Sequence, residues 1–495
     1  MESRVNAPRA VEPASEPRRE GAYDLADVGR FLEDAIARTP EAPMLVVVPA
    51  PVGDPLAALR RLRKQDTWLL SRPASGAESA ETLLGLGVAD VHRLARGERL
   101  AQLGRALQGT DRTLVRAVHP GSRSALAERL PMRFVGLAFA DGAADEEPWR
   151  ELGDGRVTAP RWTYLREGEH AVLAWHGTER WSGQATVVRG ELEAIVGALA
   201  GARSVPLARP RVVSEDRTSR SSYEAHVRRA LESIGRGELE KIVTARRAVI
   251  STASDLVAED VLAALPEVGA TRFLVRVGGT SFVGATPERL FRKQGRQLTT
   301  EALAGTRASA AESAERVLLS SDKDRDEHAP VVRTIVASLE GLGARVRADA
   351  TPRIKRVANL VHLRTAISAE LPVDVDAARL LAVLHPTPAV GGSPVPEAIA
   401  WLERHETPRG WYAGPLGWVD ARGDAEVLVA LRAAVVRGAR AWIYAGGGIV
   451  AGSSPGAEYA ETELKMTPLL RAVGAEPRIT PDTPQDAAGA PVRLS

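Results

Sequence analysis

The segment from Arg440 to Lys465 brings together residue types that can bind charged groups. Its consecutive glycines, Gly446 to Gly448, follow an apolar run and can present backbone N–H groups to an anion. Beyond them, Glu458, Glu461 and Lys465 share one face of a predicted helix, because their spacing is i, i+3 and i+7. Donors for an anion and carboxylates for a cation together suggest a metal-assisted site for a carboxylate or phosphate ligand.

Each part of this segment also has an ordinary structural explanation. The glycines can form a strand-end turn, and a Glu/Lys helix face is commonly a solvated ion pair worth roughly a few tenths of a kcal/mol. Gly446, Gly448 and Ala451 fit the loose GxGxxG/A pattern of dinucleotide sites. A Ser-Ser-Pro segment follows them instead of an apolar helix, which argues against a Rossmann site.

A lysine and a glutamate elsewhere occupy positions where catalytic groups are often found. Lys241 begins the strand-like run KIVTAR and is either a solvated edge residue or a desolvated base. Glu288 follows a Thr-Pro pair at the end of a predicted strand, so it is either a positioned acid or an ordinary turn residue. Gly305 and Thr306, in EALAGT, can present an N–H and a hydroxyl to a ligand.

Residues 321–340 predict a helix with an acid and a histidine facing inward. The apolar stripe of this helix begins at Val331, and Glu327 and His328 lie about one turn before it. A buried carboxylate requires a cation or strong donors. The alternative is a polar helix start with acids near the positive end of the dipole. Pro330 fits a first turn but kinks a helix interior, so the position of the start stays open.

Residues 425–436 predict one long strand with an arginine on an otherwise apolar face. Val427, Val429 and Leu431 share one face, and Arg432 interrupts the other. An inward arginine is expected to be paired, and its planar fork suits a carboxylate of the protein or of a ligand.

The elements that position these groups are a mixture of helices and strands. Before residue 204 no histidines and carboxylates cluster at ligand spacing, so this half is interpreted as scaffold. Apolar periodicity predicts helices at 25–37, 55–64 and 221–236, strands at 44–48, 133–139, 162–166 and 170–175, and a hairpin from strands 272–277 and 281–285.

Composition is that of an ordinary soluble enzyme. The 495 residues are 44% hydrophobic, enough for a large core, and the formal charge of +2 gives no bulk argument for nucleic acid or an anionic membrane. The absence of cysteine excludes disulfides, thiolate metal ligands and a cysteine nucleophile. The charged, Pro-rich N-terminus does not resemble a secretory signal, and no apolar run of about 20 residues is present, so a cytoplasmic location is expected.

The chain is expected to have two parts between disordered ends. Residues 1–20 and 473–495 are polar and Pro-rich and predict a leader and a tail. The segment 205–220 is the best junction, and it divides an N-terminal scaffold part, 21–215, from a catalytic part, 216–472.

A series of motifs from Ser221 to Ala472 resembles the chorismate-binding enzymes. This family includes isochorismate synthase, salicylate synthase and the large subunits of anthranilate and aminodeoxychorismate synthases. The N-terminal half resembles the menaquinone-type isochorismate synthases at PAPVGDPLAALRRLRKQDTWLLSRP and MRFVGLAFADGAADEEPW. In chain order, the motifs of the second half are FVGATPERL, EALAGTRA, DKDRDEH, VHLRTAI, LHPTPAVGGSP, RGWYAGPLGW, VLVALRAA and AGGGIVAGSSPGAEYAETELK.

Two positions distinguish the activities within this family. Members that add water resemble this chain in having a lysine at Lys241, whereas members that add ammonia have an uncharged residue there. Ala389 in LHPTPAVGG resembles the residue found at this position in isochorismate synthases, whereas salicylate synthases have threonine there. The resemblance therefore implies isochorismate synthase, for menaquinone or a catechol siderophore. The alternatives are a salicylate synthase, an amine-adding synthase with a glutaminase partner, and a catalytically silent chorismate-binding protein.

The resemblance also implies roles for individual residues. Lys241 would be the general base for water attack at C2 of chorismate, and Glu288 the acid that protonates the departing C4 hydroxyl. Glu327 and Glu461 would hold one Mg²⁺, and Glu458 would support that shell. The substrate-binding set would be Gly305, Thr306 and His362 around the ring, and Tyr412, Arg432, Gly446, Gly448 and Lys465 around the enolpyruvyl carboxylate.

The fold that the resemblance implies is α+β, with two large, mainly antiparallel sheets packed together and helices outside. The division at residue 215 would then be a boundary in sequence and not in space. The expected partner is the small molecule chorismate, with no nucleic acid, membrane or obligatory glutaminase, and the expected state is a monomer. One departure from the family pattern is Ala-Thr-Pro-Glu at 285–288, where many relatives have Ser-Ser-Pro-Glu; it leaves the acid in place.

Overall fold

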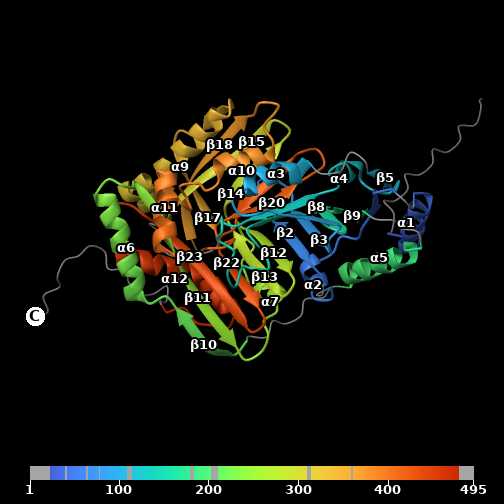
Figure 1. Ribbon diagram of the computed structural model, residues 1–495, viewed down its shortest axis with the longest axis horizontal. Coiled ribbons are helices and arrows are strands. Elements are labelled where there is room, and N and C mark those ends of the chain that lie inside the picture. Colours follow the sequence, from blue (N-terminus) through green and yellow to red (C-terminus); the bar gives the residue numbers. More distant parts are fainter. Residues whose placement is uncertain are drawn as a thin grey trace, which may run out of the picture.

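The strands of this chain form two large, mainly antiparallel sheets with helices outside (Figure 1). The computed structural model describes residues 23–39, 42–62, 65–76, 78–108, 114–178, 183–201, 210–308, 314–357 and 360–478. Side chains from both sheets meet in one apolar core. The α+β fold implied by the resemblance is therefore confirmed. The expected leader, 1–20, and residues 479–495 of the expected tail lie outside the described residues.

The larger sheet has 13 strands within the described residues, and only its edge pair β1–β5 is parallel. Its order is β10 (Val212–Arg217), β11 (Lys241–Thr252), β23 (Arg440–Ile449), β22 (Ala433–Arg437), β13 (Thr280–Thr286), β12 (Thr271–Val277), β2 (Thr67–Arg72), β3 (Glu81–Leu86), β8 (Trp162–Glu167), β9 (His170–Gly177), β1 (Met44–Pro49) and β5 (Val115–Val118), with β19 (Gly392–Ser393) paired to β11.

The smaller sheet has 10 strands in the part of the chain that the structure describes. Its order is β16 (Arg345–Ala348), β18 (Leu360–Glu370), β15 (Gln297–Ala308), β14 (Arg289–Gln294), β21 (Ala425–Val429), β20 (Pro415–Val419), β6 (Arg133–Leu137), β7 (Gly155–Ala159) and β4 (Asp90–Arg93), with β17 (Arg353–Val357) paired to β18.

Alternation along the strands fills two apolar layers. In β12, Phe273 and Val275 point into the core shared by the sheets, whereas Leu274 points into the layer beneath the outer helices.

The described helices are α1 (Leu25–Arg38), α2 (Pro55–Leu59), α3 (Arg99–Gln108), α4 (Ser124–Ala127), α5 (Ala185–Ala200), α6 (Arg220–Gly235), α7 (Ala258–Ala263), α8 (Ala314–Ser320), α9 (Asp322–Gly341), α10 (Ala377–Leu384), α11 (Val395–His405) and α12 (Pro455–Ala472).

Several predicted elements are confirmed. The helices predicted at 25–37 and 221–236 are α1 and α6, and the predicted hairpin is β12 paired with β13 across Gly278 and Gly279. The helix predicted at 321–340 is α9, which begins at Asp322 under a cap from the Ser321 side chain and continues through Pro330. None of the described helices is long and apolar enough to cross a membrane.

Two predicted elements are right in type but wrong in extent. The helix predicted at 55–64 ends at Leu59, because the chain turns there before it enters β2. The strand predicted at 425–436 is two strands in different sheets: β21 pairs with β14 and β20, whereas β22 pairs with β13 and β23. The chain crosses between the sheets at 430–432, where Arg432 has a φ of 49°.

The predicted boundary at residue 215 does not separate the sheets. Strand β2 pairs with β12 in the larger sheet, and β6 pairs with β20 in the smaller one, so each sheet contains strands from both parts. After α12, Val473 and Ala475 are buried against the outer apolar layer.

Candidate active site

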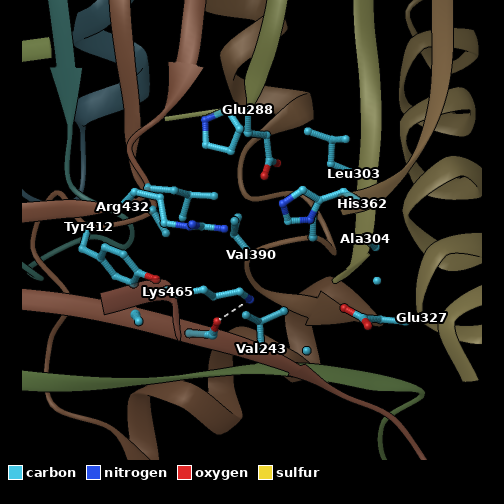
Figure 2. Close-up of a pocket in the computed structure, with 18 of the residues that line it drawn as sticks. Val243, Glu288, Leu303, Ala304, Glu327, His362, Val390, Tyr412, Arg432 and Lys465 are labelled. Carbon is cyan, nitrogen blue, oxygen red and sulfur yellow. Dashed lines mark hydrogen bonds between the residues drawn. The ribbon is translucent and has the colours of Figure 1, made fainter. Parts of the chain in front are cut away.

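A cavity that opens to solvent is lined by strands of both sheets and by helices α9 and α12. Figure 2 shows Glu288 pointing into the cavity from the top and Arg432 from the left, with Lys465 and Glu327 on the wall opposite Glu288. The cavity brings together most of the predicted site residues, which are Glu288, Gly305, Glu327, His362, Tyr412, Arg432, Gly446, Gly448 and Lys465.

Four predicted site residues do not appear in this lining. Lys241 is fully buried behind Glu327. Glu458 and Glu461 lie on α12, below the wall formed by the glycines of β23. Thr306 pairs with His362 through the backbones of β15 and β18, and its side chain lies outside what the structure describes.

The glycines 446–448 are part of strand β23, so the predicted strand-end turn is wrong. Gly448 pairs with Val243 and Gly446 with Ala245 of β11, a long-range partner that local spacing does not show. Their lack of side chains makes room for the cavity. A Cβ atom on Gly448 would lie 2.2 Å from Glu327 Oε1, and one on Gly446 would lie 3.4 Å from the Tyr412 hydroxyl.

Lys241 is the first residue of β11 and has no exposed surface. Its Nζ lies 3.3 Å from Glu327 Oε1 and donates a hydrogen bond of 3.2 Å to the Glu327 carbonyl oxygen. Strand β19 covers it through the pair Lys241–Ser393. Of the two explanations of Lys241 that the sequence left open, the structure therefore excludes the solvated edge residue.

Glu288 is buried at the junction of β13 and β14. Its N–H donates to Thr286 Oγ1 at 3.2 Å, and its carbonyl accepts from the Val429 N–H at 3.1 Å, so the backbone is held on both sides. Burial raises the pKa of Glu288 to about 7, and the negative charge of Glu301 contributes to the rise. The carboxyl is therefore partly protonated at neutral pH, as a general acid requires.

Three glutamates from α9 and α12 lie in one another's electrostatic field. Burial raises the pKa of Glu458 to about 7, and the charges of Glu461 and Glu327 contribute to the rise. Lys323 Nζ donates a hydrogen bond to Glu458 at 2.8 Å, and its positive charge opposes the rise in the pKa of Glu458. Mutually repelling carboxylates favour a bound cation.

A complete metal cage is nevertheless absent from the described residues, where no three His, Asp or Glu side chains are placed to hold a metal ion. Mg²⁺ typically takes one or two protein carboxylates and completes its octahedron with water and ligand oxygens. Glu327 and Glu461 would supply two such carboxylates, and in this structure they pair with Lys241 and Lys465.

Three further cavity side chains have protonation states or contacts that suit an anionic ligand. Burial, with the charges of Arg432 and Lys465, lowers the pKa of His362 well below its usual range, so the imidazole is neutral. Burial raises the pKa of Tyr412 to about 12, which keeps it a phenol. Lys465 Nζ donates to the Gly446 carbonyl at 2.9 Å and pairs with Glu461 at 2.6 Å.

Arg409 is a cavity residue to which the sequence reasoning gave no role. Its buried guanidinium donates to the carbonyls of Val390 (3.0 Å) and Val243, which belong to two walls of the cavity, and to Glu406 at 2.7 Å. The arginine therefore fixes the two walls relative to each other. The sequence could have indicated this residue, because Arg409 is the first residue of the family motif RGWYAGPLGW.

Comparisons with known proteins agree over almost the whole described chain. The family model for chorismate binding enzyme matches residues 30–474. A salicylate biosynthesis isochorismate synthase from Pseudomonas aeruginosa is 36% identical over 351 residues, which cover 69% of this chain and 74% of that protein. The isochorismate synthase MenF of Bacillus subtilis is 29% identical over 360 residues, 70% of this chain and 76% of that protein.

Solved structures show the same fold. The menaquinone-specific isochorismate synthase MenF from Escherichia coli has a TM-score of 0.72 and 25% identity, covering 90% of this chain and 99% of that one. Anthranilate synthase component I from Streptococcus pneumoniae has a TM-score of 0.60 at 18% identity, covering 80% and 93%, a likeness of fold alone.

Proposed function

Since the chain belongs to the chorismate-binding enzyme family, we propose that it is an isochorismate synthase that interconverts chorismate and isochorismate with Mg²⁺. The observation that carries the proposal is a buried lysine beside a cavity that holds a buried acid: Lys241 Nζ lies 3.3 Å from the cavity residue Glu327, and Glu288, with a pKa of about 7, lines the same cavity. Members of the family that add water resemble this chain in having the lysine, which favours water over ammonia as the nucleophile.

In the proposed reaction, water adds at C2 while the C4 hydroxyl leaves and the ring double bonds shift. Lys241 takes the proton of the attacking water, and Glu288 gives its proton to the departing hydroxyl, so one water enters and one leaves. Because Glu288 is partly protonated near neutral pH, it can act as acid in one direction and as base in the other.

The charges around the cavity complement a dianion. Arg432, Lys465, the hydroxyl of Tyr412 and the backbone at Gly446 and Gly448 would bind the enolpyruvyl carboxylate. Glu327 and Glu461, supported by Glu458, would hold the Mg²⁺, whose charge would neutralise the other substrate carboxylate when it is bound. Gly305, Thr306 and His362 would surround the ring.

The product assay tests the proposal. Purified protein is incubated with chorismate, with and without Mg²⁺ and ammonia, and the products are resolved by chromatography. Isochorismate is expected, only with Mg²⁺ and unaffected by ammonia. Salicylate or anthranilate as the main product would contradict the proposal, and chorismate binding without any product would indicate a silent family member.

Replacement of Lys241 tests the base separately. Lys241→Ala should lower turnover on the order of 100-fold or more, the usual contribution of a general base. Chorismate and Mg²⁺ binding, measured by calorimetry, should persist because the proposed substrate and metal ligands are other residues. A variant with full activity would remove Lys241 from the mechanism.

Three further properties belong to the same proposal. The product would serve menaquinone or siderophore synthesis, and no glutaminase partner would be needed because water is the nucleophile. We expect a monomer in the cytoplasm. Size-exclusion chromatography with light scattering measures the oligomeric state.

A further inference from the structure

A lysine outside the cavity lining contacts the backbone next to Glu288. Lys355 on β17 donates through Nζ to the Pro287 carbonyl at 2.8 Å and also to Glu301. Pro287 directly precedes Glu288, so Lys355 holds the peptide that joins them. Its side chain is 23% exposed and therefore partly shielded from solvent.

The partner of Lys355 is itself fixed. Glu301 on β15 is only 9% exposed, and its second carboxylate oxygen accepts from Arg364 Nε of β18 at 2.5 Å. Glu301 is thus a buried anion held between two cations. Its charge is the second cause, after burial, of the raised pKa of Glu288, and Lys355 is the strongest opposing charge.

We infer that Lys355 and Glu301 are positioning residues for Glu288, which hold its backbone and set the electrostatic field at its carboxyl. The inference rests on the proposed function for the role of Glu288 as the acid. The pair does this without contacting substrate, because neither residue lines the described cavity.

The other charged and titratable groups around Glu288 have different functions. Lys241 and Lys465 also act on its carboxyl, but the first is the proposed base and the second lies on the substrate side. From the cavity, His362 is neutral, and the other charged or titratable groups of the lining are Arg432, Tyr412, Arg409 and Glu327. Arg289, the next residue in the chain, pairs with Glu78 and Glu426. Glu301 and Lys355 are therefore the groups that can be changed without removing a substrate contact.

Two substitutions should move the titration of Glu288 in opposite directions. Glu301→Gln removes a negative charge and should lower the pKa of Glu288, whereas Lys355→Met removes a positive charge and should raise it. Each shift is expected to be on the order of one pH unit, as for a single charge near a buried carboxyl. A purely structural role would lower activity without opposite shifts.

The titration can be followed without turnover. The infrared C=O band of protonated Glu288, identified by its loss in Glu288→Gln, is measured between about pH 5 and about pH 9, a window in which ordinary carboxyls are ionised. The alkaline limb of kcat/KM for isochorismate formation should follow the same shifts. If the product proves to be another compound, the proposed function fails, but the infrared titration still decides the inference.

Matched variants separate positioning from folding. Lys293 is another buried lysine that donates to a backbone carbonyl, that of Gly423 at 3.0 Å, and Lys293→Met should leave the Glu288 titration unchanged. Lys355→Arg keeps the positive charge, so in this variant Glu288 should titrate at nearly the same pH as in the parent protein. Shifts in the same direction for Glu301→Gln and Lys355→Met, or none in either, would overturn the inference.

Discussion

At the scale of single residues, Glu288 links activity to stability. Its pKa is 4.5 in the unfolded chain and about 7 in the fold, where burial disfavours the charged form. Below pH 4.5 the carboxyl is mostly neutral in both states, so its ionisation does not change the free energy of unfolding. Between the two values the unfolded state loses its proton first, so folding becomes progressively less favourable as the pH rises. Above about pH 7 the loss in the free energy of unfolding stays constant, at about 3 kcal/mol.

Glu288→Gln should therefore be inactive but more stable at alkaline pH. Urea unfolding at pH 8 should show a gain of up to about 3 kcal/mol over the parent, and at pH 4 almost none, because only the ionised form is penalised. Glu232, exposed on α6, provides the control: Glu232→Gln should give no comparable gain in stability at pH 8. An equal gain for Glu288→Gln at pH 4 and pH 8 would contradict the ionisation argument.

The sequence could identify these residues but not their environment. Lys241 and Glu288 both lie at strand ends in the sequence, which also allows a solvated edge lysine and an ordinary turn glutamate, because burial depends on remote partners. Lys241 is enclosed by β19 and α9, which follow it by many residues in the chain. Glu301 opens the motif EALAGTRA but its role was missed, and Lys355 lies in no motif, since their contact joins two strands through the fold of β15, β17 and β18.

At the scale of elements, the sequence predicted strands more reliably than their partners. The apolar run at 425–436 correctly indicated β structure, but β21 and β22 pair in different sheets, and no local pattern records that change. The glycines 446–448 resembled a turn because glycine weakens an isolated strand. Pairing with β11 keeps them extended, and the space they leave is part of the cavity.

Gly448→Ala should damage the site while keeping the strand. Its Cβ would meet Glu327 Oε1 at 2.2 Å, and this flexible carboxylate can move whereas the backbone of β11 need not. We expect an unchanged fold by circular dichroism, weaker Mg²⁺ binding by calorimetry, and turnover reduced about 10-fold or more, as for small misplacements of catalytic groups. Gly452→Ala, whose Cβ would meet only Lys323 at 3.7 Å, is the control. Parent-like Mg²⁺ affinity in Gly448→Ala would show that Glu327 is not a ligand.

At the scale of the whole molecule, the two halves of the chain are interleaved in the same sheets. Strand β2 pairs with β12 and β6 with β20, so removal of residues 1–215 would leave β12 and β20 each without one neighbour, and it would also cut β10, the partner of β11. Trp411 packs on Trp68 at 6.0 Å and donates to the Gly153 carbonyl at 2.7 Å. Contacts essential to the catalytic part are thus supplied by the part interpreted as scaffold.

The fragment 216–495 should consequently fail to fold alone, although it carries every proposed site residue. Removal of residues 1–215 would uncover large apolar side chains such as Phe273 and Trp411, each worth roughly 1.5–3 kcal/mol when buried. A few such losses exceed the roughly 5–15 kcal/mol that stabilises a domain. Urea unfolding followed by circular dichroism should show a cooperative transition for the full chain and none for the fragment. A cooperative, chorismate-binding fragment would instead establish residue 215 as a true domain boundary, with the N-terminal strands as an addition to a self-sufficient catalytic unit.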